Sequence, residues 1–296
     1  MPVPETRPAP WHPCVQTCFP PCHSAPRVRQ TARRYKMAIL ERHDTGAIAR
    51  LHLNAPASLN ALSDAMLTAL SEALDKLAGD RAIRVVILSG AGKAFCAGHD
   101  LKEMQAARQA ADGGAAAFGD LFDRCTAVMR QIRTLPQPVI AQPHGIATAA
   151  GCQLVATCDL AVAAQDTRFG VNGVNIGLFC STPMVALSRN VPRKQAFEML
   201  TTGAFIDTDR AVEIGLINRA VPAETLEAET MQLAETLAAK LSSAVRVGKA
   251  AFYAQAELPV EEAYALTGQV MVQNMLDAET DEGITAFLEK RPPDWG

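Results

Sequence analysis

The sequence predicts an α/β fold, with a largely parallel sheet covered by helices on both faces and a helical C-terminal region. Up to about residue 190, short apolar segments alternate with amphipathic ones, which favours strands alternating with helices. The segments "RVVILSG", "PVIAQP" and "LAVAA" are almost continuously apolar, as is typical of strands buried on both faces. From about Pro192 the pattern is helical almost to the end.

Length and composition indicate one large globular domain. The chain has 296 residues, a net charge of -3 and 49% hydrophobic residues. The near-neutral charge gives no general attraction to nucleic acid or to anionic membranes, so we expect neither as a partner. No apolar run approaches the ~20 residues that a transmembrane helix needs. Five of the eight cysteines lie at irregular spacings in apolar segments, which predicts buried thiols in a reducing compartment rather than a disulfide framework and favours the cytoplasm. They are Cys96, Cys125, Cys152, Cys158 and Cys180.

Residues 1–36 differ from the rest of the chain. They contain eight of the 18 prolines, six Lys or Arg residues and one acid, Glu5, and we expect them to be disordered. Two explanations stay open: a targeting segment, which would place a eukaryotic protein in the mitochondrial matrix, or a translation start placed before the true first residue, Met37. The string "HPCVQTCFPPCH" has Cys and His but no paired CxxC spacing, so we expect no metal site.

The remaining elements follow in chain order. "AILERHD" and "GAIARLHLN" flank Thr45-Gly46 and predict a β-hairpin. Ser63 is placed to cap a helix. The apolar face of that helix consists of Met66, Leu70, Leu74 and Leu77. A second apolar stripe consists of Leu226, Leu233, Leu237 and Leu241, and Pro259 opens another helix. We therefore divide the chain into a tail (1–36), an α/β core (37–225) and a helical C-terminal region (226–296).

Two loops at strand ends are candidates for one site. Residues 91–104, "AGKAFCAGHDLKEM", follow one apolar strand, and residues 144–152, "HGIATAAGC", follow another. Neighbouring strand ends of a parallel sheet usually line one crevice. Gly and Ala leave backbone N–H groups unshielded, so the two loops could form an oxyanion hole. Alternatively, the small residues serve only tight packing of helix on strand. Neither a Walker loop nor GxGxxG is present, which disfavours a phosphate or dinucleotide cradle.

The longer motifs resemble one protein family. "SLNALS", "KAFCAGHDLKEM", "PVIAQPHGIATAAGCQLVATCDLAVAAQDTRFG" and "NIGL" occur in the order typical of the enoyl-CoA hydratase/isomerase (crotonase) superfamily. "GHDL", "ATAAGCQLVA" and "VPRK" are most similar to its enoyl-CoA hydratase domain-containing protein 3 group. The resemblance implies a crotonase-like ββα superhelix core, an acyl-CoA substrate with coenzyme A as part of it, and no separate cofactor. It also implies a homotrimer, or a homohexamer of two trimers, assembled through the C-terminal helices.

The resemblance also implies roles for individual residues. The amides of His99 and Ala150 would hold the thioester carbonyl and stabilise the enolate. Asp100, Leu101 and Lys102 would line the path of coenzyme A. Residues assigned to the acyl site are Gly151, Gly173, Cys180 and Ser181, and Thr182 adjoins them.

Both acids of the family's hydratases are missing. The glutamate that follows the Gly-rich loop is replaced by Gln153, and the one after "FG" is replaced by Gly173. A glutamine can hold a water molecule but cannot take its proton at neutral pH. The His99 ring is a candidate substitute acid or base. The alternative for Asp100 is a helix cap, and His144 and Asp159 are expected to be structural, Asp159 as a turn residue.

Three functions therefore stay open. The first is an acyl-CoA-processing enzyme of the hydratase or isomerase type, nominally a lyase of fatty acid metabolism. The second is a decarboxylase of a malonyl-type CoA, in which loss of carbon dioxide generates the enolate without a strong base. In the decarboxylase branch that "AGHD" and "VNIG" also resemble, a tyrosine stands where this chain has Cys180. The third is a non-catalytic acyl-CoA-binding protein. Fold alone does not decide among them.

Overall fold

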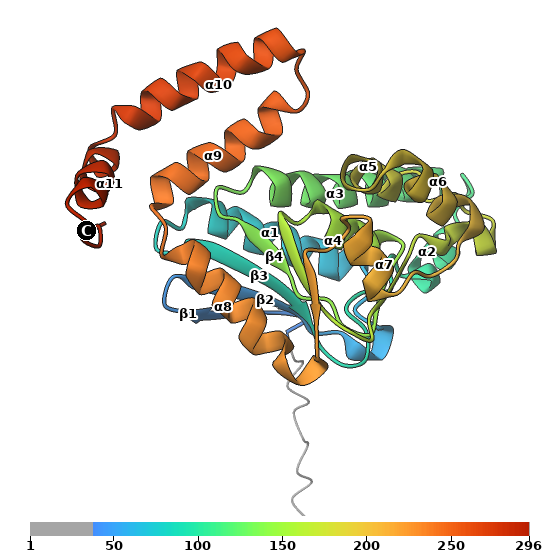
Figure 1. Cartoon of the computed structure of the whole chain (residues 1–296). Helices are drawn as coiled ribbons and strands as arrows, with labels where there is room; N and C mark the ends of the chain where they lie inside the picture. The colour runs from blue at the N-terminus through green and yellow to red at the C-terminus, as the bar shows by residue number, and fades with distance from the viewer. Residues whose placement is uncertain (1–37, 296) are drawn as a thin grey trace, which may run out of the picture. The chain divides into compact units, whose positions relative to one another are not determined.

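The computed structural model describes residues 38–295. The predictions for the tail, including its cysteines, concern residues outside this range. The described chain is mixed α/β, as predicted, and its helices and strands alternate through the core (Figure 1).

The main sheet has six strands in the order β1-β2-β3-β4-β6-β8. Their bounds are β1 Leu40–Thr45, β2 Ile48–Leu53, β3 Val85–Gly90, β4 Val139–Ala141, β6 Leu160–Ala164 and β8 Arg219–Val221. β1 and β2 form the predicted antiparallel hairpin, in which Thr45 lies opposite Ile48, and every later pair is parallel. The edge strand β8 was not predicted, because its three residues carry no apolar run.

Helices cover both faces of this sheet. The face bearing Val86 and Leu88 belongs to the core cluster of α1 (Asp64–Gly79) and α3 (Ala115–Thr134). Val85 and Ile87 point to the other face and cluster with residues of α8 (Leu226–Ala238). Because successive side chains of a strand alternate between faces, burial on both sides explains the continuous apolar runs. The predicted cap of α1 is confirmed, since the Ser63 hydroxyl accepts a 3.3 Å hydrogen bond from the Met66 amide.

Smaller elements lie in the connections that precede α8 in the chain. β5 (Ile146–Thr148) and β7 (Arg168–Gly170) form a separate parallel pair. α4 (Ala150–Thr157) begins directly after β5. The remaining elements of this part are η1 Pro56–Ser58, α2 Leu101–Ala107, η2 Asn172–Ile176, α5 Pro183–Asn190, α6 Arg193–Thr202, α7 Thr208–Glu213 and η3 Ala223–Thr225.

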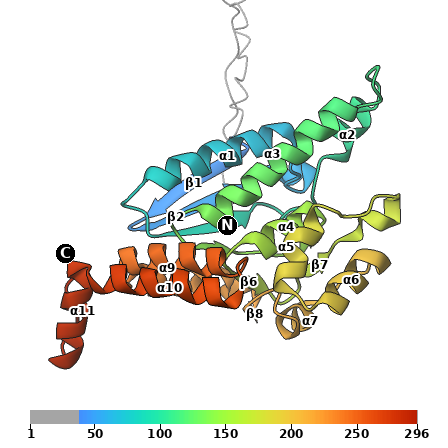
Figure 2. The same cartoon turned by 90° about the horizontal axis from the view of Figure 1, so that it is seen from above.

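The C-terminal helices follow α8. α9 (Ser242–Gln255) packs near the ends of α3 and β4, and α10 (Val260–Met275) runs back alongside α9 (Figures 1 and 2). α11 (Ala278–Leu288) closes the described chain. α10 has no fully buried residue, and several of its apolar side chains are exposed, among them Tyr264, Met271 and Val272. Within residues 38–295, no helix is long and apolar enough to cross a membrane.

Candidate active site

The two predicted loops lie against each other. The Cys96 amide donates to the Ile146 carbonyl at 3.2 Å, and the Thr148 amide donates to the Cys96 carbonyl at 3.0 Å. Gly98 is so close to the start of α4 that a Cβ placed on it would lie 3.3 Å from the Ala150 amide nitrogen. Gly151 is equally restricted, because a Cβ there would overlap the Cys96 carbonyl. The small residues therefore serve close packing, and that packing brings the two loops together.

Asn60 holds the first loop in place. It is fully buried, accepts a 2.9 Å hydrogen bond from the Ala55 amide and donates at 2.8 Å to the carbonyls of Ala91 and Ala94. Sequence reasoning did not assign it a role, although it lies within "SLNALS". A polar residue between apolar ones in that motif was the available signal, since buried amides need partners.

The amides of His99 and Ala150 are both unused donors. Neither donates a hydrogen bond to another residue in the range 38–295. Ala150 is the first residue of α4, where an amide has no partner inside the helix. Ala149 precedes it with φ 50 and ψ -120, an unfavourable conformation for a side chain. Both amides are therefore available to donate hydrogen bonds to a ligand.

The His99 ring packs into the protein beside this site. Its centroid lies 5.6 Å from that of Phe122 in an edge-to-face contact. Neither ring nitrogen has a hydrogen-bond partner among residues 38–295. Burial lowers the pKa of His99, and the neighbouring Leu62 backbone opposes that shift only in part. The ring is therefore neutral near pH 7 and packs as an apolar group.

The residues after His99 begin α2. The Asp100 carboxylate accepts hydrogen bonds from the amides of Lys102 at 2.8 Å and Glu103 at 3.4 Å. Asp100 is thus a helix cap, which was the alternative role predicted for it. Leu101 is 53% exposed, and Lys102 is also exposed. Both side chains are accessible at the rim of the site.

Gln153 lies one turn after Ala150, at a cavity of about 560 Å³. We call this cavity the acyl pocket; it lies between α3, α4, α5 and the end of α9. Its apolar lining includes Met129, Ala156, Val185, Ala186 and Phe252. The side-chain oxygen of Gln153 is buried and accepts no hydrogen bond from any residue between 38 and 295. A buried carbonyl without a donor is a strong acceptor for a hydroxyl group or a water molecule.

Gly173 and Cys180 pack against each other. Both are buried, and Gly173 lies in η2. A Cβ on Gly173 would lie 2.5 Å from the Leu178 carbonyl oxygen and 2.9 Å from Cys180 Sγ. Burial raises the pKa of the Cys180 thiol, which keeps it protonated. Ser181 is exposed and its neighbour Thr182 lines the acyl pocket, so the structure places Thr182 rather than Ser181 at the cavity.

Asp159 lies in the bend between α4 and β6, as expected of a turn residue, but it also has a second role that the sequence did not predict. Its carboxylate accepts hydrogen bonds from the Val139 amide at 2.6 Å, Lys249 Nζ at 2.7 Å and the Tyr253 hydroxyl at 2.7 Å. Lys249 also donates to the carbonyls of Ile132 and Gln137, which satisfies its three N–H groups. Burial lowers the pKa of Lys249, and Asp159 opposes that shift. This network fastens α9 to the core; sequence periodicity could not reveal it, because the partners lie 90 residues apart.

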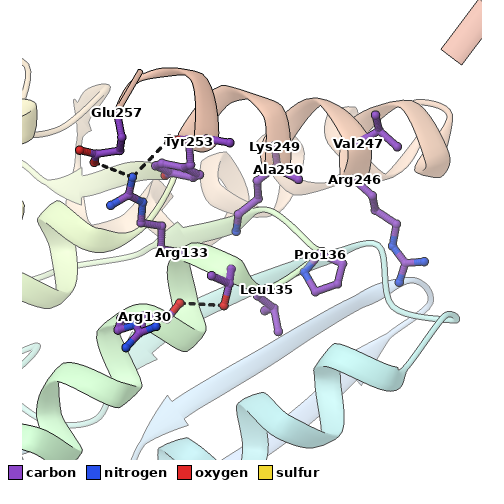
Figure 3. Close-up of a pocket in the computed structure, with 12 residues that line it drawn as sticks. Arg130, Arg133, Leu135, Pro136, Arg246, Val247, Lys249, Ala250, Tyr253 and Glu257 are labelled. Atoms are coloured by element: carbon purple, nitrogen blue, oxygen red, sulfur yellow. Dashed lines mark hydrogen bonds and ion pairs between the residues drawn. The ribbon is translucent and has the colours of Figure 1, made fainter. Parts of the chain in front are cut away.

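A second cavity, of about 670 Å³, lies beside the acyl pocket (Figure 3). Arg130, Arg133, Tyr253 and Glu257 line both cavities, so the two adjoin along α3 and α9. In Figure 3, Arg133 points from α3 toward Tyr253 and Glu257 on α9. His144 is structural, as expected, because its Nε2 contacts the Gly92 carbonyl at 2.8 Å. No group of three or more His, Cys, Asp or Glu residues suited to a metal ion occurs in the described part of the chain.

Comparison with known proteins identifies the family. The sequence model for enoyl-CoA hydratase/isomerase matches residues 43–296. The chain belongs to the enoyl-CoA hydratase/isomerase family. Its fold is accordingly crotonase-like, with a helical C-terminal region, as the sequence motifs implied.

Several relatives of this family are similar over most of their length. Enoyl-CoA hydratase domain-containing protein 3, mitochondrial, from Homo sapiens is 46% identical, over 84% of this chain and 80% of the relative. The solved human structure of that protein has a TM-score of 0.83 and 44% identity, over 87% of this chain and all of the other. An enoyl-CoA hydratase structure from Mycobacterium smegmatis has a TM-score of 0.84 and 54% identity, over 87% and 98%.

Proposed function

We propose that this protein binds acyl-CoA thioesters and stabilises a thioester enolate with the amides of His99 and Ala150. The family supports an acyl-CoA-processing enzyme. The observation that carries the proposal is the pair of unused amides on two loops in contact. One such donor, aimed at the developing oxyanion, stabilises a transition state by about 3–4 kcal/mol.

The acid–base part of the reaction depends on Gln153. Its unpartnered carbonyl oxygen lies one helical turn from Ala150, where it can accept a hydrogen bond from water or from a substrate hydroxyl. Gly173 has no side chain that could act as a second acid. Leu178 and Cys180 occupy the space beside it. Hydration by this site would therefore be slow compared with that of a site bearing two carboxylates.

One observation favours a second candidate, decarboxylation of a malonyl-type CoA. Neither family acid position carries a carboxylate, whereas both oxyanion-hole amides are unused. In that reaction the bond between the α-carbon and the carboxylate breaks and carbon dioxide leaves. The electron pair of the broken bond stays on the α-carbon and forms the thioester enolate. The enolate then takes a proton at carbon. This chemistry needs the two amides but no strong base.

The test is incubation of the full chain with crotonyl-CoA, and separately with malonyl-CoA and methylmalonyl-CoA, followed by mass spectrometry. Gln153→Ala is the matched control. Hydrated crotonyl-CoA that is lost in the variant supports the hydratase. Release of carbon dioxide supports the decarboxylase. Failure of all three thioesters to bind would contradict the proposal.

We also propose that the chain assembles as a homotrimer, or as a hexamer of two trimers, through its C-terminal helices. Apolar side chains on α10 and α11, and on Leu276 just after α10, are exposed to solvent in the single chain, with Tyr264 at 75%, Leu276 at 81% and Phe287 at 82% exposed. Contiguous exposed apolar side chains on helices usually mark an interface. Light scattering of the full chain measures the assembly directly, and a monomer would contradict this part of the proposal.

A further inference from the structure

The acyl pocket has a direction. Gln153, one helical turn from Ala150, lines it on α4, and charged residues of α3, α5 and α9 line it elsewhere, whereas His99 and Ala150 are not among its lining residues. Phe122, which contacts His99, lies on the same face of α3 as Thr126, Met129 and Arg133. At 1.5 Å per residue, Phe122 and Arg133 are separated by roughly 16 Å along α3, and Ala150 and Thr157 by roughly 10 Å along α4.

The far end of the pocket carries an excess of positive charge. We call Arg130, Arg133 and Arg189 the arginine cluster, and all three line the pocket. The single acid beside them is Glu257, whose Oε1 lies 2.9 Å from Arg133 Nη2 and 3.5 Å from Arg189 Nε. Arg130 is exposed, and its guanidinium makes no hydrogen bond or ion pair with residues 38–295. Three guanidinium groups therefore face one carboxylate, which leaves positive charge that a further anion can offset.

The rest of the wall is mixed but mostly apolar. Its apolar side chains are Met129, Ala156, Val185, Ala186, Phe252 and Ala256, and its uncharged polar ones are Thr126, Thr157, Thr182 and Asn190. Thr157 and Asn190 already donate to the backbone carbonyls of Gln153 and Ala156. A ligand that fills such a pocket is largely apolar along its length and negatively charged at its far end. Guanidinium groups bind carboxylates through paired, charge-assisted hydrogen bonds, which favours a carboxylate as that end.

We propose that the acyl group of the substrate ends in a carboxylate, which the arginine cluster binds. This inference rests on the proposed function, since it assigns the thioester end to His99 and Ala150. The substrate class is then the mono-CoA thioester of a medium- or long-chain dicarboxylic acid. Malonyl-type thioesters, although candidates for chemistry at the hole, are too short to span roughly 10–16 Å.

The test compares two matched series of thioesters by calorimetry on the full chain. One series is octanoyl-, decanoyl- and dodecanoyl-CoA, and the other consists of the mono-CoA thioesters of the dicarboxylic acids of the same lengths. We expect at least one dicarboxylic thioester to bind about tenfold or more tightly than its methyl-ended partner, because a charge-assisted hydrogen bond contributes that much. This preference should weaken as salt rises.

Variants connect the preference to the cluster. Arg130→Gln should remove most of the preference without weakening the methyl-ended series, and Arg130→Lys should retain part of it. Arg81→Gln, an exposed arginine in the turn between α1 and β3, is the matched control and should change neither series.

Equal affinity for the two series would overturn this inference and leave the proposed function standing. Absence of binding by both series would overturn the two together. Inorganic phosphate and free suberate serve as competitors. If either binds at the cluster while the two thioester series bind equally, the cluster is a separate anion site and the inference is wrong.

Discussion

Cys180 Sγ lies 2.9 Å from the point where a Cβ on Gly173 would stand. The Leu178 carbonyl oxygen is closer still to that point, at 2.5 Å. Gly173, which the sequence motifs match to an acid of the family's hydratases, is therefore packed against its neighbours. Substitution of a glutamate there requires the backbone between Gly173 and Cys180 to move.

The first prediction concerns Gly173. Gly173→Ala should lower the free energy of unfolding by about 1–3 kcal/mol, because overpacking forces the Leu178 carbonyl to shift. Denaturant unfolding measures the change. Gly79→Ala is the control, since open space surrounds that glycine. Equal stability of the two variants would mean that the packing around Gly173 is looser than described. For the same reason, the double variant Gln153→Glu, Gly173→Glu should gain little hydratase activity, because a side chain at position 173 has no space unless the backbone moves.

The second prediction concerns the network that fastens α9. Asp159→Asn should cost about 3–5 kcal/mol of stability, because it leaves the Lys249 ammonium, whose side chain is 7% exposed, without its carboxylate. Glu257→Gln, which removes a half-exposed ion pair, should cost no more than about 1 kcal/mol. Adding Lys249→Met to Asp159→Asn should recover part of the loss. A double variant less stable than Asp159→Asn would contradict the account.

The third prediction concerns pH. Burial lowers the pKa of His99 in the folded protein, whereas an unfolded histidine takes up its proton near pH 6.5. The unfolded state therefore binds more protons below that pH, and the free energy of unfolding falls as pH drops below about 6.5. His99→Gln should flatten this fall between about pH 5 and 6.5. The control is His43→Gln, on an exposed position of β1. If both variants keep the same dependence of the unfolding free energy on pH, His99 is not the cause of the loss of stability at low pH.

The fourth prediction concerns Ala149. Its φ of 50 and ψ of -120 should cost about 1–3 kcal/mol, and Ala149→Gly should relieve that strain. The added chain entropy of glycine offsets about 0.5–1 kcal/mol, so we expect a net stabilisation. Ala147→Gly, in the buried strand β5, should instead destabilise. Thermal unfolding of the two variants compares them, and destabilisation by Ala149→Gly would show that the Ala149 methyl packing outweighs the strain.

The fold was predictable where local patterns carry it. The hairpin, the Ser63 cap and the parallel pairing of the apolar strands β3, β4 and β6 were predictable from apolar runs and turn residues, whereas the strand order was not predicted. The edge strand β8 and the pair β5–β7 are too short for periodicity to detect. Such strands form because longer elements on either side position them.

The candidate site was predictable only in part. The Gly- and Ala-rich composition predicted that the two loops pack closely. Gly98 and Gly151 lie at the contact, where a larger side chain would overlap the other loop. The partners of Asp159 and the arginine cluster come from α3, α5 and α9, far apart in sequence. In the sequence, charged residues on an amphipathic helix are expected to face solvent. No local pattern distinguishes charged residues that face solvent from charged residues that line a cavity.

The central claim is that the amides of His99 and Ala150 hold a thioester carbonyl. The most direct measurement compares butyryl-CoA with S-butyl-CoA, a thioether of the same chain without the carbonyl oxygen. Affinities come from calorimetry, and amide hydrogen exchange is read by mass spectrometry over residues 96–101 and 147–153. We predict that butyryl-CoA binds about tenfold more tightly, consistent with two hydrogen bonds, and that it alone slows exchange in both segments. Equal affinity of the two ligands, with no protection of either segment, would contradict the account.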